Sequence, residues 1–157
     1  MSKTILRKTA RRERFFRYAL LVVWIAVIFI ASSNAGSMSN TSRFIRPVLE
    51  WLFPHASEET LTAYHAFIRK LAHVTEYAIL AFWASRAFIN SAKLLPRKFW
   101  FALAFVVVLL VACADEFNQS FNAARTSSVY DVLLDCAGGA MMIFIFYLIK
   151  YKTKNRK

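Results

Sequence analysis

Four long apolar segments constrain this chain more than any other feature of its sequence. They cover about residues 17–35, 68–90, 98–114 and 130–149. A membrane-spanning helix needs roughly 17–25 predominantly apolar residues, and each segment is long enough to meet that requirement. None of them shows the alternation of apolar and polar residues that is typical of strands. The sequence therefore predicts an all-α, polytopic membrane protein with four transmembrane helices.

The first segment also allows a second interpretation. A basic leader, a short apolar stretch and the small residues Ser33, Asn34 and Ala35 resemble a secretory signal with its cleavage site. On either interpretation, the chain that follows this segment begins outside the membrane.

The basic residues predict the orientation of the helices. The chain has 21 lysines and arginines against nine acids, a formal net charge of +12. Most of the basic residues precede the first segment, lie between the second and third, or follow the fourth, which assigns these regions to the cytoplasm. We expect one domain over residues 5–150, with basic cytoplasmic tails at residues 1–16 and 151–157. The charge thereby reflects topology and attraction to anionic lipids, and nucleic acid is not expected as a partner.

Two regions are expected outside the membrane, about Gly36–Phe67 and Asp115–Tyr130, both as polar loops. The first contains a short, proline-bounded amphipathic segment at residues 46–54 that suits the membrane interface. Ser57, followed by two glutamates, has the pattern of a helix start, because its hydroxyl can cap the first turn and the acids face the positive end of the helix dipole. We therefore expect the second helix to begin near Ser57 and to project above the bilayer.

Ionisable residues interrupt the apolar segments and predict a polar layer in the outer half of the bundle. A charge near the bilayer centre costs about 2.5–3.5 kcal/mol, so such residues should face other helices rather than lipid. The spacing of three between Lys70, His73 and Glu76 places them on one helix face. The layer is expected to contain Lys70, His73, Glu76, Tyr77, Asp115, Glu116, Gln119, Arg125, Asp131 and Asp135.

Acids outnumber bases in this layer, which leaves three alternatives. Some carboxyls carry a proton, a cation is bound, or the ligand itself is cationic. Asp135 is the deepest acid of the fourth helix, with Lys70 and Arg125 as candidate ion-pair partners. We expect it to be protonated or hydrogen-bonded to His73 or Tyr77. Gly138 and Gly139 follow on the same helix and allow another helix to approach closely.

An ordered set of short motifs resembles the VanZ-like family of small bacterial membrane proteins. The motifs are Ser32-Ser33-Asn34, Lys70-x-x-His73-x-x-Glu76-Tyr77, Asp115-Glu116-x-x-Gln119, Arg125, Ser127-x-x-x-Asp131 and Gly138-Gly139. The family tends to have Gln at the position of Asn34 and Asn at that of Asp135. The resemblance implies a multi-pass protein of the bacterial cytoplasmic (inner) membrane. It also implies a relation to a protein linked with low-level resistance to teicoplanin-type lipoglycopeptide antibiotics.

Three functions are compatible with this sequence. The first is binding or modification of a cell-envelope component, such as a lipid-linked precursor, a lipid headgroup or a lipoglycopeptide, with membrane lipids as partners. The second is a membrane-embedded hydrolase or transferase, with His73 as general base, Glu76 or Asp135 orienting it, and Lys70 and Arg125 holding an anionic group. The third is a structural membrane subunit, so the sequence leaves open whether the chain is an enzyme.

Candidate site residues follow from these hypotheses. The candidate catalytic residues are His73, Glu76 and Asp115. The candidate substrate-binding residues are Lys70, Tyr77, Glu116, Gln119, Arg125, Asp131, Asp135 and Ser33. The carboxylates together with His73 could also bind a divalent metal, although the sequence contains no metal-binding motif such as HExxH.

Overall fold

A computed structural model describes residues 3–33, 37–89, 97–121 and 128–155. Its elements are α1 (Lys3–Ala31), α2 (Met38–Leu52), α3 (Glu58–Phe88), the short 3₁₀ helix η2 (Arg97–Phe99), α4 (Trp100–Ser120) and α5 (Val129–Asn155). The described ranges contain no strand, so the all-α prediction is confirmed for this part of the chain.

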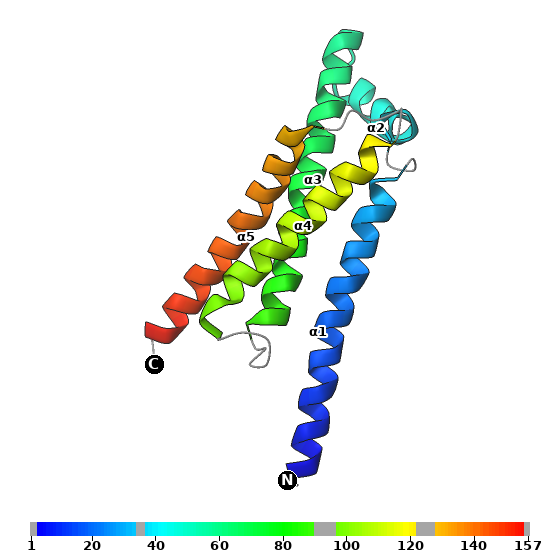
Figure 1. Cartoon of the computed structure of the whole chain (residues 1–157). Helices are drawn as coiled ribbons and strands as arrows, with labels where there is room; N and C mark the ends of the chain where they lie inside the picture. Colours follow the sequence, from blue (N-terminus) through cyan, green and yellow to red (C-terminus); the bar gives the residue numbers. More distant parts are fainter. Residues whose placement is uncertain (1–2, 34–36, 90–96, 122–127, 156–157) are drawn as a thin grey trace.

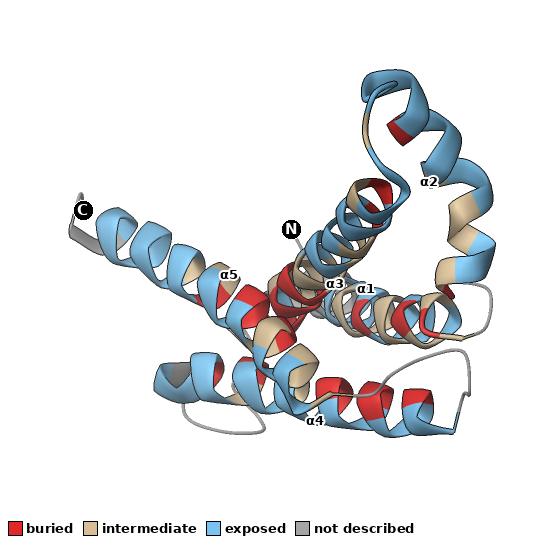
Figure 2. Cartoon of the chain, turned by 90° about the horizontal axis from the view of Figure 1, so that it is seen from above, coloured by how far each residue is buried: buried red, intermediate tan, exposed pale blue. Residues whose placement is uncertain are grey.

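Helix α3 lies at the centre of the fold and packs against α1, α2, α4 and α5 (Figure 1). Its inward face consists largely of small residues, among them the buried Ala81 and Ala84, which let neighbouring helices come close. Seen from above, the buried residues of α3, α4 and α5 face one another near the middle of the molecule (Figure 2). Helix α1 adds Leu21 and Ile28 to this core.

The two adjacent glycines of α5 mark its closest contacts with other helices. A Cβ at Gly138 would lie 2.4 Å from the carbonyl oxygen of Val74 on α3. A Cβ at Gly139 would lie 2.6 Å from Cγ1 of Val108 on α4. Both distances are too short for any side chain, so the close approach predicted at these glycines is confirmed.

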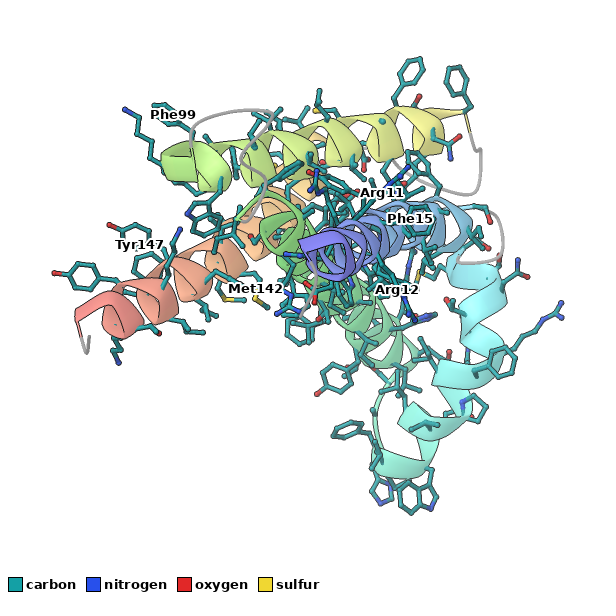
Figure 3. All side chains as sticks on the ribbon, turned by 90° about the horizontal axis from the view of Figure 1, so that it is seen from below. Arg11, Arg12, Phe15, Phe99, Met142 and Tyr147 are labelled. Atoms are coloured by element: carbon teal, nitrogen blue, oxygen red, sulfur yellow. The ribbon has the colours of Figure 1, made fainter. Side chains whose placement is uncertain are left out.

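Three helices are long and apolar enough to cross a membrane: Arg11–Ala31 within α1, Trp100–Ser120 (α4) and Val129–Thr153 within α5. They carry many exposed large apolar side chains, and Phe99 and Tyr147 lie at the periphery of the molecule in Figure 3. Such exposed apolar surface is typical of contact with lipid. Helix α3 is not among the three, because polar residues such as His73, Glu76 and Arg86 lower its mean hydropathy.

The start of α3 is where the sequence predicts it. Ser57 is the N-cap residue, and its hydroxyl oxygen accepts a hydrogen bond from the backbone N–H of Thr60 at 3.2 Å. The helix therefore begins well before its apolar segment and extends beyond the other long helices, toward α2 (Figure 1).

Both predicted outer loops contain more helix than expected. Residues 46–52 of the predicted amphipathic segment form the second half of a longer helix, α2. Pro47 lies inside this helix instead of bounding it. Helix α4 continues through Asp115 and Glu116 to Ser120, so the loop predicted from residue 115 begins later. The polar residues looked like a loop in the sequence, but buried hydrogen bonds described below hold them in the last turns of the helix.

Helix α2 packs beside the first turns of α3 through a small polar contact centred on His65. The hydroxyls of Thr41 and Ser42 lie 3.0 Å and 3.3 Å from the two ring nitrogens of His65. Burial and the nearby charge of Arg69 lower the pKa of this histidine. The contact therefore favours the neutral imidazole and links α2 to α3.

Candidate functional site

Six polar side chains meet inside the bundle, and we call them the buried polar cluster. They are Ser32, directly after α1, His73 and Tyr77 of α3, Asp115 and Gln119 of α4, and Asp135 of α5. Asp115 and Asp135 are only 0% and 1% exposed. Carboxylates so deeply buried are rare unless they are paired or bind a ligand, which makes the cluster the strongest candidate site in the described residues.

Asp115 is the hub of the hydrogen bonds in this cluster. Its Oδ2 accepts a hydrogen bond from the hydroxyl of Tyr77 at 3.2 Å and another from Nε2 of Gln119 at 3.0 Å. The same Nε2 of Gln119 also donates to the hydroxyl of Ser32 at 3.2 Å. Side chains of α3 and α4 thus hold one oxygen of Asp115 in place, and Ser32, directly after α1, holds Gln119.

His73 and Asp135 face each other across the contact between α3 and α5. Nδ1 of His73 lies 3.7 Å from Oδ1 of Asp135. This distance exceeds the roughly 2.7–3.2 Å of a hydrogen bond, so the interaction is electrostatic and depends on protonation of the imidazole. Gly138 brings the two residues together, because it lies about one turn from Asp135 and contacts Val74, the neighbour of His73.

Three buried polar atoms of the cluster have no hydrogen-bond partner among the described residues: Nδ1 of His73, Oδ1 of Asp115 and Oδ1 of Asp135. An unsatisfied buried polar atom costs about 1–3 kcal/mol, and more when the group is charged. His73, Asp115 and Asp135 each also offer one potential metal ligand, and these three atoms lie within 4.8 Å of one another. The cluster therefore has unused capacity to bind a cation or a hydrogen-bonding group.

The cluster contains five of the residues predicted from the sequence and one that was missed. The five are His73, Tyr77, Asp115, Gln119 and Asp135. Ser32 was missed, and Ser33 was named in its place. Ser33 donates instead to the carbonyl oxygen of Ile30 at 2.6 Å. The sequence indicated that this pair of serines at the end of α1 belongs to the site. The packing of α1 decides which of the two hydroxyls faces α4.

Of the two alternatives predicted for Asp135, a protonated carboxyl or a hydrogen bond to His73 or Tyr77, the described residues do not show the hydrogen bond. Nδ1 of His73 is too distant, and the hydroxyl of Tyr77 donates to Asp115. The protonated carboxyl stays a prediction. Lys70 is a candidate partner of Asp135, but its Nζ lies 4.0 Å from Oδ1 of Asp131. Lys70 is 60% exposed and Asp131 34% exposed, so this pair lies at the rim of the cluster.

The remaining predicted residues lie around the cluster or outside the described residues. Glu116 is buried, and its Oε1 accepts a hydrogen bond at 2.5 Å from the backbone N–H of Ser128, just before α5. Glu76 is partly buried, and its carbonyl oxygen accepts a hydrogen bond from the indole of Trp24 at 2.9 Å, which ties α1 to α3. Arg125 lies outside the described residues.

Comparison with known proteins relates the chain to a protein family. A family model with the description VanZ/LLP1 matches residues 15–150, which include every residue of the buried polar cluster. No curated protein and no solved structure matches the chain.

Proposed function

This chain belongs to the VanZ/LLP1 family, and from that premise we propose that it binds or modifies a component of the bacterial cell envelope at its buried polar cluster. The family and the apolar helices identify a membrane protein. The observation that carries the proposal is a set of buried, unpaired polar atoms enclosed by helices whose outer surfaces are apolar. Ionisable groups inside a membrane are costly and mark functional sites by default.

The topology that we propose has four spans, with both termini in the cytoplasm of a bacterium. Helix α3 would cross the membrane in addition to the three apolar helices, as the second span in chain order. Helices α1, α4 and α5 pack around it and supply protein contacts for its polar residues. The two ends of the chain lie at one end of the molecule and α2 at the other, in agreement with basic cytoplasmic tails (Figure 1). The cluster then lies in the outer half of the membrane, because it involves the end of α4 and the start of α5.

This placement suits a ligand that has an apolar tail and a polar head. A lipid-linked precursor, a lipid headgroup or a lipoglycopeptide of the teicoplanin type could contact the apolar helices with its tail. Its head would meet the rim formed by Lys70 and Asp131 and then the cluster itself. Resistance to teicoplanin-type antibiotics is one physiological role that would follow from such binding.

Catalysis at the same site is the second candidate. The approach of His73 to Asp135 favours it, because a carboxylate beside an imidazole can orient it and stabilise its protonated form. This geometry supports Asp135 over Glu76 as the partner of a general base. The reaction would be a hydrolysis or group transfer on the envelope component.

A binding experiment on the purified protein tests the proposal. The wild type and the variants His73→Ala and Asp115→Asn would be purified in mild detergent, and co-purified lipids would be identified by native mass spectrometry. We expect a specific lipid in the wild type and its loss in both variants. Thr75→Ala is the matched control, because this residue of α3 is exposed and its hydroxyl donates to the carbonyl oxygen of Leu71 in the same helix. Identical lipid profiles in all four proteins would overturn the proposal.

Susceptibility of bacteria that express these proteins at equal levels provides a second measurement. Cells with the wild type should tolerate more of a teicoplanin-type lipoglycopeptide than cells with either cluster variant. Product formation from a bound lipid by the wild type alone would favour the catalytic alternative.

A further inference from the structure

We propose that His73, Asp115 and Asp135 bind a divalent metal ion, with Zn²⁺ as the first ion to test. Each of the three side chains comes from a different helix and contributes one ligand atom to a group within 4.8 Å. A neutral imidazole and two carboxylates form a mixed nitrogen and oxygen ligand set, which Zn²⁺ accepts readily. This inference rests on the proposed function for the role of the site, whereas the binding of a metal can be measured separately.

The unpaired atoms of the cluster point independently to a cation. Asp115 and Asp135 are at least nine-tenths buried. Among the residues that the structure describes, Oδ1 of each aspartate and Nδ1 of His73 have no hydrogen-bond partner. A buried carboxylate oxygen can be satisfied by a donor, a proton or a metal. A single metal ion can satisfy all three atoms at once, because a carboxylate oxygen and an unprotonated ring nitrogen both offer lone pairs.

The distance between His73 and Asp135 fits a shared metal better than a direct bond. Two ligand atoms that each lie about 2.0–2.2 Å from one Zn²⁺ are roughly 3.0–3.7 Å apart at angles of 90–120°. Nδ1 of His73 and Oδ1 of Asp135 are 3.7 Å apart, at the upper end of this interval. All three ligand atoms lie within 4.8 Å of one another, so the widest separation has to close by at most about 1 Å. Rotation of a carboxylate, whose terminal torsion is broad, can supply this movement.

Tyr77, Gln119 and Ser32 have the arrangement of residues that support a metal ligand. Tyr77 and Gln119 both donate to Oδ2 of Asp115, which leaves Oδ1 for another partner. Ser32 holds the amide of Gln119 in turn. Carboxylates that bind metals are commonly oriented by hydrogen bonds of this kind, and loss of such a bond typically weakens metal affinity about 10–100-fold.

The charge of the cluster agrees with a dication. Asp115 and Asp135 together carry two negative charges when ionised, and His73 is uncharged when it acts as a ligand. Lys70 approaches Asp131 at the rim, so within the described part of the chain its ion pair lies outside the triad. Three protein ligands also leave coordination positions open, as catalytic zinc sites do, where a polar headgroup or a water could bind.

A metal titration of the full-length protein in detergent tests the inference. After treatment with a chelator, the wild type should bind one Zn²⁺ per chain by isothermal titration calorimetry and by elemental analysis. Asp135→Asn and His73→Gln should weaken this binding at least tenfold, and Tyr77→Phe about tenfold. Glu59→Gln is the matched control, because it makes the same carboxylate-to-amide change at an exposed position on α3.

The outcomes separate this inference from the proposed function. A wild type that binds no Zn²⁺, or Asp135→Asn and His73→Gln variants with unchanged affinity, would overturn the metal site whatever lipid is bound. Stoichiometric binding that these variants lose would support the site, even if the lipid profile proves independent of the cluster and the proposed function fails. Circular dichroism and gel filtration confirm folding, and Asp135→Asn decides the question if His73→Gln does not fold.

Discussion

Replacement of Gly138 by alanine should force α3 and α5 apart and thereby disturb the buried polar cluster. The new Cβ would lie 2.4 Å from the carbonyl oxygen of Val74, and 3.1 Å from both its carbonyl carbon and its Cα. All three atoms belong to the backbone, so no side-chain rotation can relieve the contact. An ordinary van der Waals distance between carbon atoms is about 3.5–4.0 Å, so the helices must separate locally by about 1 Å.

The expected loss of stability is the difference between two opposing effects. Alanine is favoured over glycine inside a helix by about 1 kcal/mol. Overpacking of a tight interface typically costs about 1–3 kcal/mol. We therefore expect a net loss of about 1 kcal/mol, which lowers the melting temperature by about 2–4 °C for a chain of this size. The separation should also widen the 3.7 Å gap between His73 and Asp135, and the affinity for Zn²⁺ should fall about tenfold.

Gly139→Ala provides the comparison, because its new Cβ meets a side chain. It would lie 2.6 Å from Cγ1 of Val108, and a second substitution, Val108→Ala, removes that methyl group. The double variant should regain part of the stability lost by Gly139→Ala, whereas Val108→Ala should not rescue Gly138→Ala. Thermal unfolding in detergent measures both pairs. A Gly138→Ala variant with the melting temperature and Zn²⁺ affinity of the wild type would refute the reasoning.

Three further predictions concern other parts of the molecule. Tyr77→Phe removes a hydrogen bond to Asp115 and should destabilise the protein by about 1–3 kcal/mol in thermal unfolding, because it leaves the buried carboxylate with one donor fewer; equal stability would contradict this. The pKa of His65 is lowered in the folded protein. Its contribution to the free energy of unfolding should therefore be complete above the unfolded pKa of about 6.5 and decline as the pH falls toward the lower folded pKa. A pH profile of stability that His65→Gln leaves unchanged would exclude this role. In a cysteine-free background, an impermeant thiol reagent should label Phe44→Cys but not Lys152→Cys in intact cells, and the reverse pattern would invert the proposed topology.

Much of the architecture follows from the sequence, because helix formation depends on residues close together in the chain. The apolar segments that became α1, α4 and α5, the cap at Ser57 and the close approach at Gly138 and Gly139 could all be predicted in this way. The presence of His73 and several acids within or beside apolar segments was enough to expect a polar layer, since the membrane makes isolated charges costly.

The ends of helices were less predictable, because tertiary contacts decide them. Asp115 and Gln119 have the polar character of a loop, yet they remain in α4. Their side chains are buried against Tyr77 of α3 and Ser32, the residue that follows α1. A short polar segment does not reveal such partners, which come from helices distant in the sequence.

The pairing within the site was decided by the tertiary structure alone. Successive residues of a helix are rotated by about 100°, so the rotation of the packed α1 decides whether Ser32 or Ser33 faces α4. The sequence allowed Asp135 to meet His73, Tyr77, Lys70 or Arg125. The close contact of Gly138 with Val74 brings His73 to it. Local sequence thus determines which residues belong to the polar layer, while the rotation and depth of each packed helix decide which of their atoms meet.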